Sequence, residues 1–229
     1  MTTLRTLEIF DSLQGEGYWT GTPMTFVRLS GCNGPELGLG CVAWCDTPGS
    51  WDRGAGEELE VAEILRRVHL PRLCLTGGEP LLQVDVVGEL VAEAHRWGIR
   101  VHLETNGTVE PPAHTGSGFD WVVISPKPPD YFVAPQWAGS VDELKLVVDE
   151  HLDAATAERL AAAHPGAVVF LQPASGEGAV AGTAAADGAG MAGGDGGPYQ
   201  ESCRRAIALV MDHPEWRLSL QIHKILGIS

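Results

Sequence analysis

The sequence predicts an α/β protein built on a parallel sheet that is either open or closed into a partial barrel. Two observations support this fold class. Short apolar runs alternate with segments of helical periodicity along most of the 229 residues, which is the pattern of parallel strands joined by helices. A short polar motif also follows nearly every apolar run, as expected where the carboxyl ends of such strands form a ligand site.

The first half of the chain begins with two apolar runs separated by a polar turn at residues 12–17. A third apolar run stops at the GGEP motif, and a helix that follows it is ended by Gly98, a residue common just after helices. The predicted strands are 4–10, 24–29, 72–76 and 99–104, and the predicted helices are 57–70 and 84–97. Residues 57–70 are assigned to a helix because their apolar positions fall at helical spacing.

The second half continues the same alternation. The predicted strands are 119–124, 143–148, 167–171 and 217–222, and the predicted helices are 153–164 and 199–212. Residues 174–198 are almost entirely Gly, Ala, Ser, Thr and acidic residues, a composition too poor in apolar groups to offset the entropy of ordering. Because a helix and a strand follow it, this segment is interpreted as a flexible insertion in one domain spanning residues 1–229.

Composition excludes several classes of partner. A net charge of −15 argues against binding to nucleic acid, which requires clustered Lys and Arg. The N-terminus lacks the basic flank and apolar run of a signal peptide, and no stretch is long enough to span a membrane. With 44% hydrophobic residues and five cysteines, the chain needs no disulfide framework. We therefore expect a soluble protein of the reducing cytoplasm that acts on a small molecule.

Three of the five cysteines, Cys32, Cys41 and Cys45, lie in one Gly-rich loop after a predicted strand. Three thiolates in one loop suit an iron–sulfur cluster with one iron left open. A structural zinc site would be closed by a fourth ligand and would have tighter cysteine pairs, and free cysteines are also common as small buried residues. The spacing alone favours cluster and zinc equally. Cys74 and Cys203 match no motif and are interpreted as structural.

The polar motifs are individually weak indicators. An isolated GGEP is more often a glycine turn that opens a helix, Arg28 could simply pair with Glu16, and a single His223 is more often a satisfied histidine than a ligand. All of these motifs follow predicted strands, so we expect their side chains to meet at one active site. A purely structural metal site would not need several polar loops to meet in this way.

Taken together, these motifs resemble those of the 7-carboxy-7-deazaguanine synthases, which are radical S-adenosylmethionine (SAM) enzymes. The motifs are SLQGEG, RLSGC with CVAWCDT, TGGEPLLQ, ETNGT, ISPK, ELKLVV, FLQP and RLSLQIHKILGI. The resemblance covers the chain from about residue 8 to its end, except for 107–118 and 174–198. GGEP marks only the superfamily, whereas SLQGEG, CDT and LQxHK are specific to this family.

The resemblance implies a partial TIM-type barrel and a lyase of queuosine biosynthesis. Such an enzyme contracts the ring of 6-carboxy-5,6,7,8-tetrahydropterin to 7-carboxy-7-deazaguanine with loss of ammonia. The implied cofactors are a 4Fe–4S cluster, SAM and Mg²⁺. An electron donor such as flavodoxin or ferredoxin and a homodimeric assembly are also implied.

The resemblance also assigns roles to individual residues. Cys32, Cys41 and Cys45 would hold the cluster, and Thr47 would help to hold Mg²⁺. The residues implied in SAM binding are Trp44, Cys45, Asp46, Gly77, Gly78, Glu79, Ser125, Pro126, Lys127 and Gln172. The residues implied at the pterin are Leu13, Gln14, Gly15, Glu16, Arg28, Thr76, His223 and Ser229, of which Glu16, Arg28 and His223 are the expected catalytic residues.

One motif departs from the superfamily pattern. The cysteines are spaced C-x8-C-x3-C rather than C-x3-C-x2-C, and the loop is expected to be too short for a regular helix. A lengthened loop can still keep its ends close together. Two other interpretations remain at this point. One is a different radical SAM enzyme, such as a glycyl-radical activating enzyme, and the other is a zinc-stabilised interaction module without catalysis.

Overall fold

A computed structural model describes residues 2–112, 118–174 and 197–228 of the chain. Its core is a nine-stranded sheet in the order β3-β1-β2-β4-β5-β6-β7-β8-β9. The strands are β1 Thr3–Leu13, β2 Pro23–Leu29, β3 Glu57–Glu60, β4 Arg72–Gly77, β5 Arg100–Thr105, β6 Trp121–Ile124, β7 Glu143–Val148, β8 Val168–Pro173 and β9 Arg217–Leu218. Every neighbouring pair from β2 to β9 is parallel, and β1 runs antiparallel to both of its neighbours.

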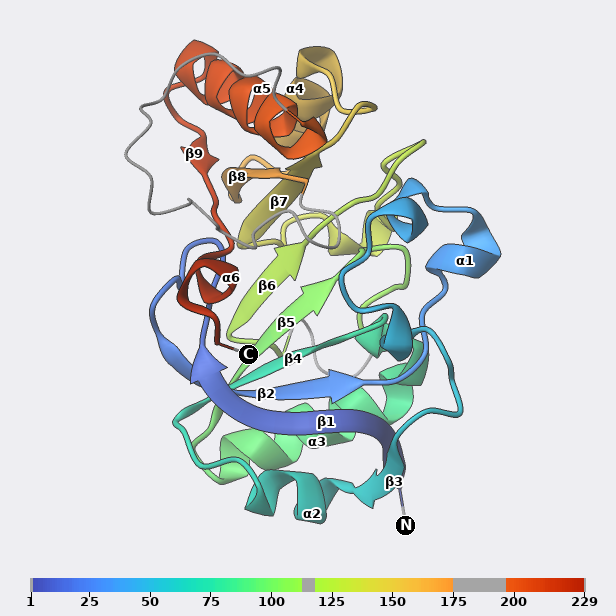
Figure 1. The fold of residues 1–229 in the computed structure, drawn as a ribbon. Helices are drawn as coiled ribbons and strands as arrows, with labels where there is room; N and C mark the ends of the chain where they lie inside the picture. Colours follow the sequence, from blue (N-terminus) through green and yellow to red (C-terminus); the bar gives the residue numbers. More distant parts are fainter. Residues whose placement is uncertain (1, 113–117, 175–196, 229) are drawn as a thin grey trace.

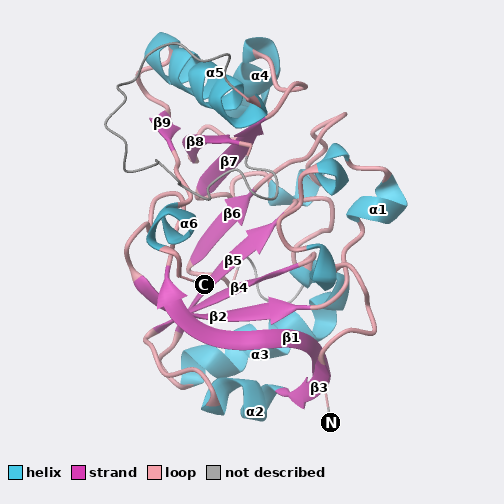
Figure 2. Ribbon diagram, in the orientation of Figure 1, coloured by secondary structure: helices cyan, strands magenta, loops and turns pink. Residues whose placement is uncertain are grey.

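The sheet curves into an incomplete barrel, and most of the helices cover its outer face (Figures 1 and 2). The helices are α1 Gly34–Leu37, α2 Val61–Arg66, α3 Val84–Arg96, α4 Ala154–Ala163, α5 Pro198–Asp212 and α6 Ile222–Leu226. Apolar residues of α2 and α3 pack under the first six strands, and those of α4 and α5 pack under β7 and β8. Helix α6 lies instead over the inner face (Figure 1). The predicted partial barrel is thus confirmed.

The predicted helix at residues 57–70 is wrong at its start. Residues Glu57–Glu60 form β3, which pairs with the first residues of β1 and buries Leu59 beside Leu4. Only Val61–Arg66 are helical. The apolar spacing is satisfied either way, because Leu59 is buried in the strand and Ile64 and Leu65 are buried in the helix.

Several other element boundaries differ from the prediction, most of them by one or two residues. Strand β9 contains only Arg217–Leu218, and Ile222, expected in that strand, begins α6. Strand β1 extends through Leu13 because its later residues pair with β2. The cysteine loop, expected to lack regular structure, contains the single turn α1 and a 3₁₀ turn at Gly40–Ala43.

Residues 175–196, most of the predicted insertion at 174–198, lie outside the described part of the chain. Across the residues that are described, no helix is long and apolar enough to cross a membrane.

Candidate active site

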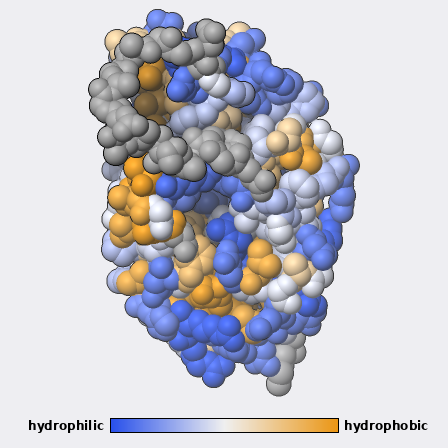
Figure 3. All heavy atoms as spheres, viewed as in Figure 1, coloured by the Kyte–Doolittle hydropathy of each residue, from blue (hydrophilic) through white to orange (hydrophobic). Residues whose placement is uncertain are grey.

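The inner face of the sheet holds a cavity of about 510 Å³ at the carboxyl ends of the parallel strands. On the face shown in Figure 3, polar side chains gather around the central hollow and apolar ones gather beside it, over α6. Of the residues predicted for the site, those that line the cavity are Leu13, Gln14, Gly15, Glu16, Arg28, Cys32, Cys41, Trp44, Cys45, Asp46, Thr47, Thr76, Gly77, Gly78, Ser125, Lys127, Gln172 and His223. Pro126 and Glu79 are not among the lining residues, and Ser229 lies outside the described residues.

All three loop cysteines are half-buried and face this cavity. A β-carbon built on Gly34 would lie 3.4 Å from the Sγ of Cys32 and 3.6 Å from the Sγ of Cys41, so both sulfurs flank this glycine. Burial raises the pKa of the Cys32 thiol, and the negative charges of Glu79, Cys41 and Cys45 raise it further. Burial also raises the pKa of Cys41, whereas Lys127 opposes that shift.

Within the described residues, no group of three or more His, Cys, Asp or Glu side chains is placed to hold a metal ion. The three thiols nevertheless line one cavity. This donor set fits an iron–sulfur cluster, which is bound by cysteine thiolates. Three protein thiolates would leave one iron of a four-iron cluster free for another ligand.

The GGEP motif joins the cysteine loop to the end of β5. A β-carbon on Gly78 would lie 2.1 Å from the carbonyl oxygen of Gly31, so only glycine fits this close backbone approach. The Glu79 carboxylate is fully buried and accepts hydrogen bonds from Thr105 Oγ1 at 2.7 Å, the Asn106 backbone N–H at 2.8 Å and the Leu81 backbone N–H at 3.1 Å. Gly77 and Gly78 thus face the cavity, and the Glu79 side chain braces the wall behind them.

Lys127, Ser125 and Trp44 form one contiguous part of the wall. The Lys127 ammonium donates to Ser125 Oγ at 2.7 Å and lies 5.3 Å from the centre of the Trp44 ring, a cation–π contact. The Trp44 indole N–H donates to Asp149 at 3.1 Å, which fixes the ring plane. An aromatic face beside a cation is suited to a planar or anionic ligand.

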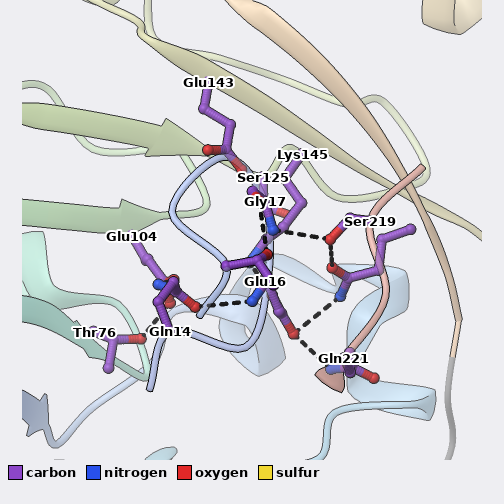
Figure 4. Close-up of polar contacts among 12 residues, drawn as sticks. Gln14, Glu16, Gly17, Thr76, Glu104, Ser125, Glu143, Lys145, Ser219 and Gln221 are labelled. Carbon is purple, nitrogen blue, oxygen red and sulfur yellow. Dashed lines mark hydrogen bonds and ion pairs between the residues drawn. The ribbon is translucent and has the colours of Figure 1, made fainter. Parts of the chain in front are cut away.

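Glu16 is the centre of a buried polar network (Figure 4). Its carboxylate forms an ion pair with Lys145 of β7 and accepts hydrogen bonds from Gln172 Nε2 at 3.1 Å and Gln221 Nε2 at 2.7 Å. Burial alone would raise the pKa of Glu16, but the Lys145 charge and these hydrogen bonds hold that pKa below its usual value. Glu16 is therefore ionised at neutral pH and tied to three separate elements.

The residues beside Glu16 are equally constrained. Gln14 Nε2 donates to Glu104 Oε1 at 3.1 Å, and Thr76 Oγ1 donates to the other oxygen of Glu104 at 2.9 Å (Figure 4). A β-carbon on Gly15 would lie 2.0 Å from Nδ1 of His223, so the imidazole packs directly on this glycine. The Gln14–Glu16 loop thus connects β4, β5 and α6 at the cavity.

The alternative that Arg28 pairs with Glu16 is wrong. Its Nε donates to Glu8 Oε1 at 2.6 Å, from the neighbouring position on β1, and its guanidinium lies 5.8 Å from the centre of the Phe10 ring. All three side chains line the cavity. Arg28 is thus held by strand pairing and remains available on the cavity wall.

At the rim, Asp46 connects the cysteine loop to α6. Its carboxylate forms an ion pair with Lys224 at 2.7 Å and accepts a hydrogen bond from Thr47 Oγ1 at 3.0 Å. Burial alone would raise its pKa, but Lys224, Thr47 and Gln221 together lower the pKa of Asp46 to about 2. The Thr47 hydroxyl therefore contacts a carboxylate at the cavity, where two hard oxygen donors lie side by side.

Several residues that line this cavity were not predicted from the sequence, namely Glu8, Glu104, Lys145, Gln221 and Lys224. For Lys145 a signal existed, because a lysine inside the apolar run ELKLVV must be paired if the strand is buried. Glu104, Gln221 and Lys224 lie within the ETNGT and RLSLQIHKILGI motifs, but nothing in the motifs indicates which neighbours they contact.

Comparison with known proteins gives a consistent result. No family model matches the chain. The curated 7-carboxy-7-deazaguanine synthase of Bordetella pertussis is 34% identical, with 96% of this chain and 97% of that protein covered. The synthase of the same name from Bacteroides thetaiotaomicron is 37% identical, with 96% of each chain covered.

A solved structure of QueE from Escherichia coli matches the fold with a TM-score of 0.67 at 25% identity, over 96% of this chain and 95% of that one. The similarity to the curated relatives is thus nearly full-length. The chain belongs to the 7-carboxy-7-deazaguanine synthase family.

Proposed function

We propose that this chain converts 6-carboxy-5,6,7,8-tetrahydropterin to 7-carboxy-7-deazaguanine with release of ammonia. The observation that carries the proposal is the single cavity in which three half-buried thiols face a polar wall containing Glu16, Arg28 and His223. Membership of the synthase family favours this reaction over glycyl-radical activation and over a non-catalytic zinc module.

Cys32, Cys41 and Cys45 are the residues that would hold a 4Fe–4S cluster, and the free iron would accept SAM. When bound, this pair of cofactors supplies the one-electron chemistry that begins the reaction. The wall formed by Gly77, Gly78, Ser125, Lys127 and Trp44 adjoins the thiols and is proposed to hold SAM. We assign Glu79 to support of this wall, because its buried carboxylate already accepts three hydrogen bonds from residues behind the wall.

The opposite part of the wall has the chemistry needed to orient the pterin. A pterin presents neighbouring N–H donors on its aminopyrimidinone edge, and the ionised Glu16 is a fixed acceptor for them. Arg28 suits the substrate carboxylate, since a guanidinium can bind two oxygens at once. Gln14, Thr76 and His223 surround the same space. A close fit of this kind excludes water and fixes the reacting carbon, as radical chemistry requires.

Four further assignments belong to the same proposal. Mg²⁺ would lie at Thr47 beside Asp46, because Mg²⁺ prefers hard oxygen donors. The exposed apolar residues Leu220, Ile225 and Leu226 on and near α6 support assembly as a homodimer. A flavodoxin or ferredoxin is proposed as electron donor, and the cytoplasm as the compartment.

The test of the proposed function is anaerobic incubation of the iron-reconstituted protein with the pterin, SAM and a reductant. We expect 7-carboxy-7-deazaguanine and ammonia in equal amounts, detected by mass spectrometry and an ammonia assay. Omitting SAM should leave the pterin unchanged. SAM cleavage without conversion of the pterin would instead indicate a different radical SAM reaction.

Replacing Arg28 by alanine should abolish most turnover while leaving iron content and SAM binding intact. The guanidinium is the cation proposed to pair with the substrate carboxylate, and loss of one partner of a buried charge pair costs about 2–5 kcal/mol. The measurement is kcat and KM for the pterin, together with iron content. Arg96→Ala is the control, since Arg96 is exposed on α3 and forms a local ion pair with Glu93. Normal turnover in Arg28→Ala would place the substrate carboxylate elsewhere.

A further inference from the structure

Beneath the Gln14–Glu16 loop lies a second, much smaller chamber that the proposed function does not use. It has a volume of about 10 Å³, which is close to the space that one water molecule requires. Its lining residues are Gln14, Glu16, Trp19, Cys74, His102, Glu104, Trp121, Val123, Glu143 and Lys145. Gln14, Glu16, Glu104, Val123 and Lys145 also line the large cavity, so the two spaces share these side chains.

The chamber has an unsatisfied donor. The indole N–H of Trp19 is buried and has no hydrogen-bond partner among the described residues. The ring is held in place by Arg72, whose guanidinium lies 4.8 Å from its centre, and by an edge contact with His102 at 5.1 Å. An unpaired buried N–H is costly, and a small polar chamber beside it indicates a bound water.

Glu143 is the second unusual group at this chamber. It is 2% exposed, and one oxygen accepts the backbone N–H of Tyr18 at 3.1 Å and the indole N–H of Trp121 at 3.2 Å. Its other oxygen packs against Gly17, where a β-carbon would lie 1.9 Å away. Burial raises the pKa of Glu143 to about 7, although Lys145 opposes this shift. Glu143 therefore gains or loses a proton near neutral pH.

The neighbouring groups Lys145, Glu16 and His102 each keep one protonation state at neutral pH. Lys145, two residues along the same strand, has a raised pKa because of the carboxylates around it, and Glu16 has a lowered one, so both stay charged. Burial lowers the pKa of His102 to about 4, so this histidine is neutral at pH 7. Glu104 reaches both the chamber and the large cavity. A single water in the chamber would lie between the carboxyl groups of Glu143 and Glu104.

We propose that this chamber holds one ordered water that connects Glu143 to Glu104, and that Glu143 stores a proton during the elimination of ammonia. The inference rests on the proposed function. Eliminating ammonia breaks a carbon–hydrogen bond, whose electron pair becomes the new double bond, and a carbon–nitrogen bond, whose electron pair leaves with nitrogen. One proton is released from carbon and one is taken up by nitrogen, so the two balance. A carboxylate joined to the cavity through Glu104 and the water holds that proton between the two events.

The chamber can be tested without turnover by nitrogen-15 NMR of the seven indole groups in the full-length chain. The Trp19 indole N–H should show a cross-peak to a long-lived water. The Trp121 indole N–H, which donates to Glu143, should shift with a midpoint near pH 7, and Glu143→Gln should remove this titration. The proposal would be overturned if the Trp19 indole N–H showed no cross-peak to water, or if the Trp121 signal did not titrate near pH 7.

Kinetics then separates proton storage from a structural role. Glu143→Gln keeps an oxygen to accept both N–H groups but cannot take up a proton. We expect single-turnover product formation at least about tenfold slower, since positioned proton-transfer groups commonly contribute a hundredfold or more. In the wild type the rate should fall as pH drops through about 7, because Glu143 then starts protonated, and the variant should lose this pH dependence.

Trp19→Phe, which keeps an aromatic ring but removes the N–H that anchors the water, should also slow product formation. Glu93→Gln is the control, because Glu93 lies on α3 and accepts hydrogen bonds from the nearby Arg96 and Trp97. A Glu143→Gln enzyme with wild-type rate and pH profile would refute proton storage. If the wild type makes no product at all, the proposed function fails, and the NMR titration still decides whether the water and the titrating Glu143 exist.

Discussion

Replacing Cys32, Cys41 or Cys45 by alanine is expected to give a protein that holds little or unstable iron and forms no product. The physical reason is the number of ligands. A four-iron cluster that leaves one iron open for SAM needs three protein thiolates, and these three cysteines are the ones that face the cavity. The measurement is iron and sulfide content after anaerobic reconstitution, alongside product formation.

The remaining two cysteines provide matched controls. Cys74 is fully buried on β4 against Met24 and Phe26, and Cys203 is half-buried on α5. Cys74→Ala and Cys203→Ala should keep the cluster and cost roughly 1 kcal/mol of stability, as small core truncations do. A Cys41→Ala protein that retained a full, SAM-cleaving cluster would show that the C-x8-C-x3-C loop is not the cluster loop.

The fold was predictable because its signals are local. Alternating strands and helices, and polar residues after each strand, can be recognised within short windows of sequence. They correctly indicated a partial barrel, and a cavity lies at the strand ends. The errors fell where tertiary pairing decides. Glu57–Glu60 became a strand through contact with β1, although their apolar spacing also suits a helix.

The candidate site was predictable in its motifs but not in its pairings. Glu16, Arg28 and His223, which the motifs indicated, line one cavity. Their ion-pair partners were not predicted: Glu16 pairs with Lys145, 129 positions away, and Arg28 pairs with Glu8 on the adjacent strand. Such pairs depend on strand register and loop geometry, which short motifs do not encode. Short motifs likewise do not show that the Glu79 carboxylate accepts hydrogen bonds from Thr105 and Asn106 behind the cavity wall.

Replacing Lys145 by alanine is expected to be the most damaging substitution outside the cysteine loop. The Lys145 and Glu16 side chains are only 10% and 13% exposed, and removing one partner of a buried ion pair costs about 3–5 kcal/mol because the other charge is left uncompensated. Turnover should be lost as well, since Glu16 would no longer be fixed at the cavity. Urea unfolding at pH 7 and product formation measure the two effects.

The pH dependence of this loss distinguishes an uncompensated charge from a simple loss of packing. In the wild type the pKa of Glu16 is lowered by Lys145, so the pair stabilises the fold above the unfolded-state pKa and loses this contribution as pH falls through the folded-state pKa. In Lys145→Ala the main influence that opposes burial is removed, so the pKa of Glu16 rises and protonation relieves the buried charge as pH falls. The stability difference between variant and wild type should therefore shrink below about pH 5. The double variant Lys145→Met with Glu16→Gln, which removes both charges while keeping side-chain volume, should recover most of the stability at pH 7 but none of the turnover. A difference that stayed constant with pH would mean that Lys145 contributes mainly through packing.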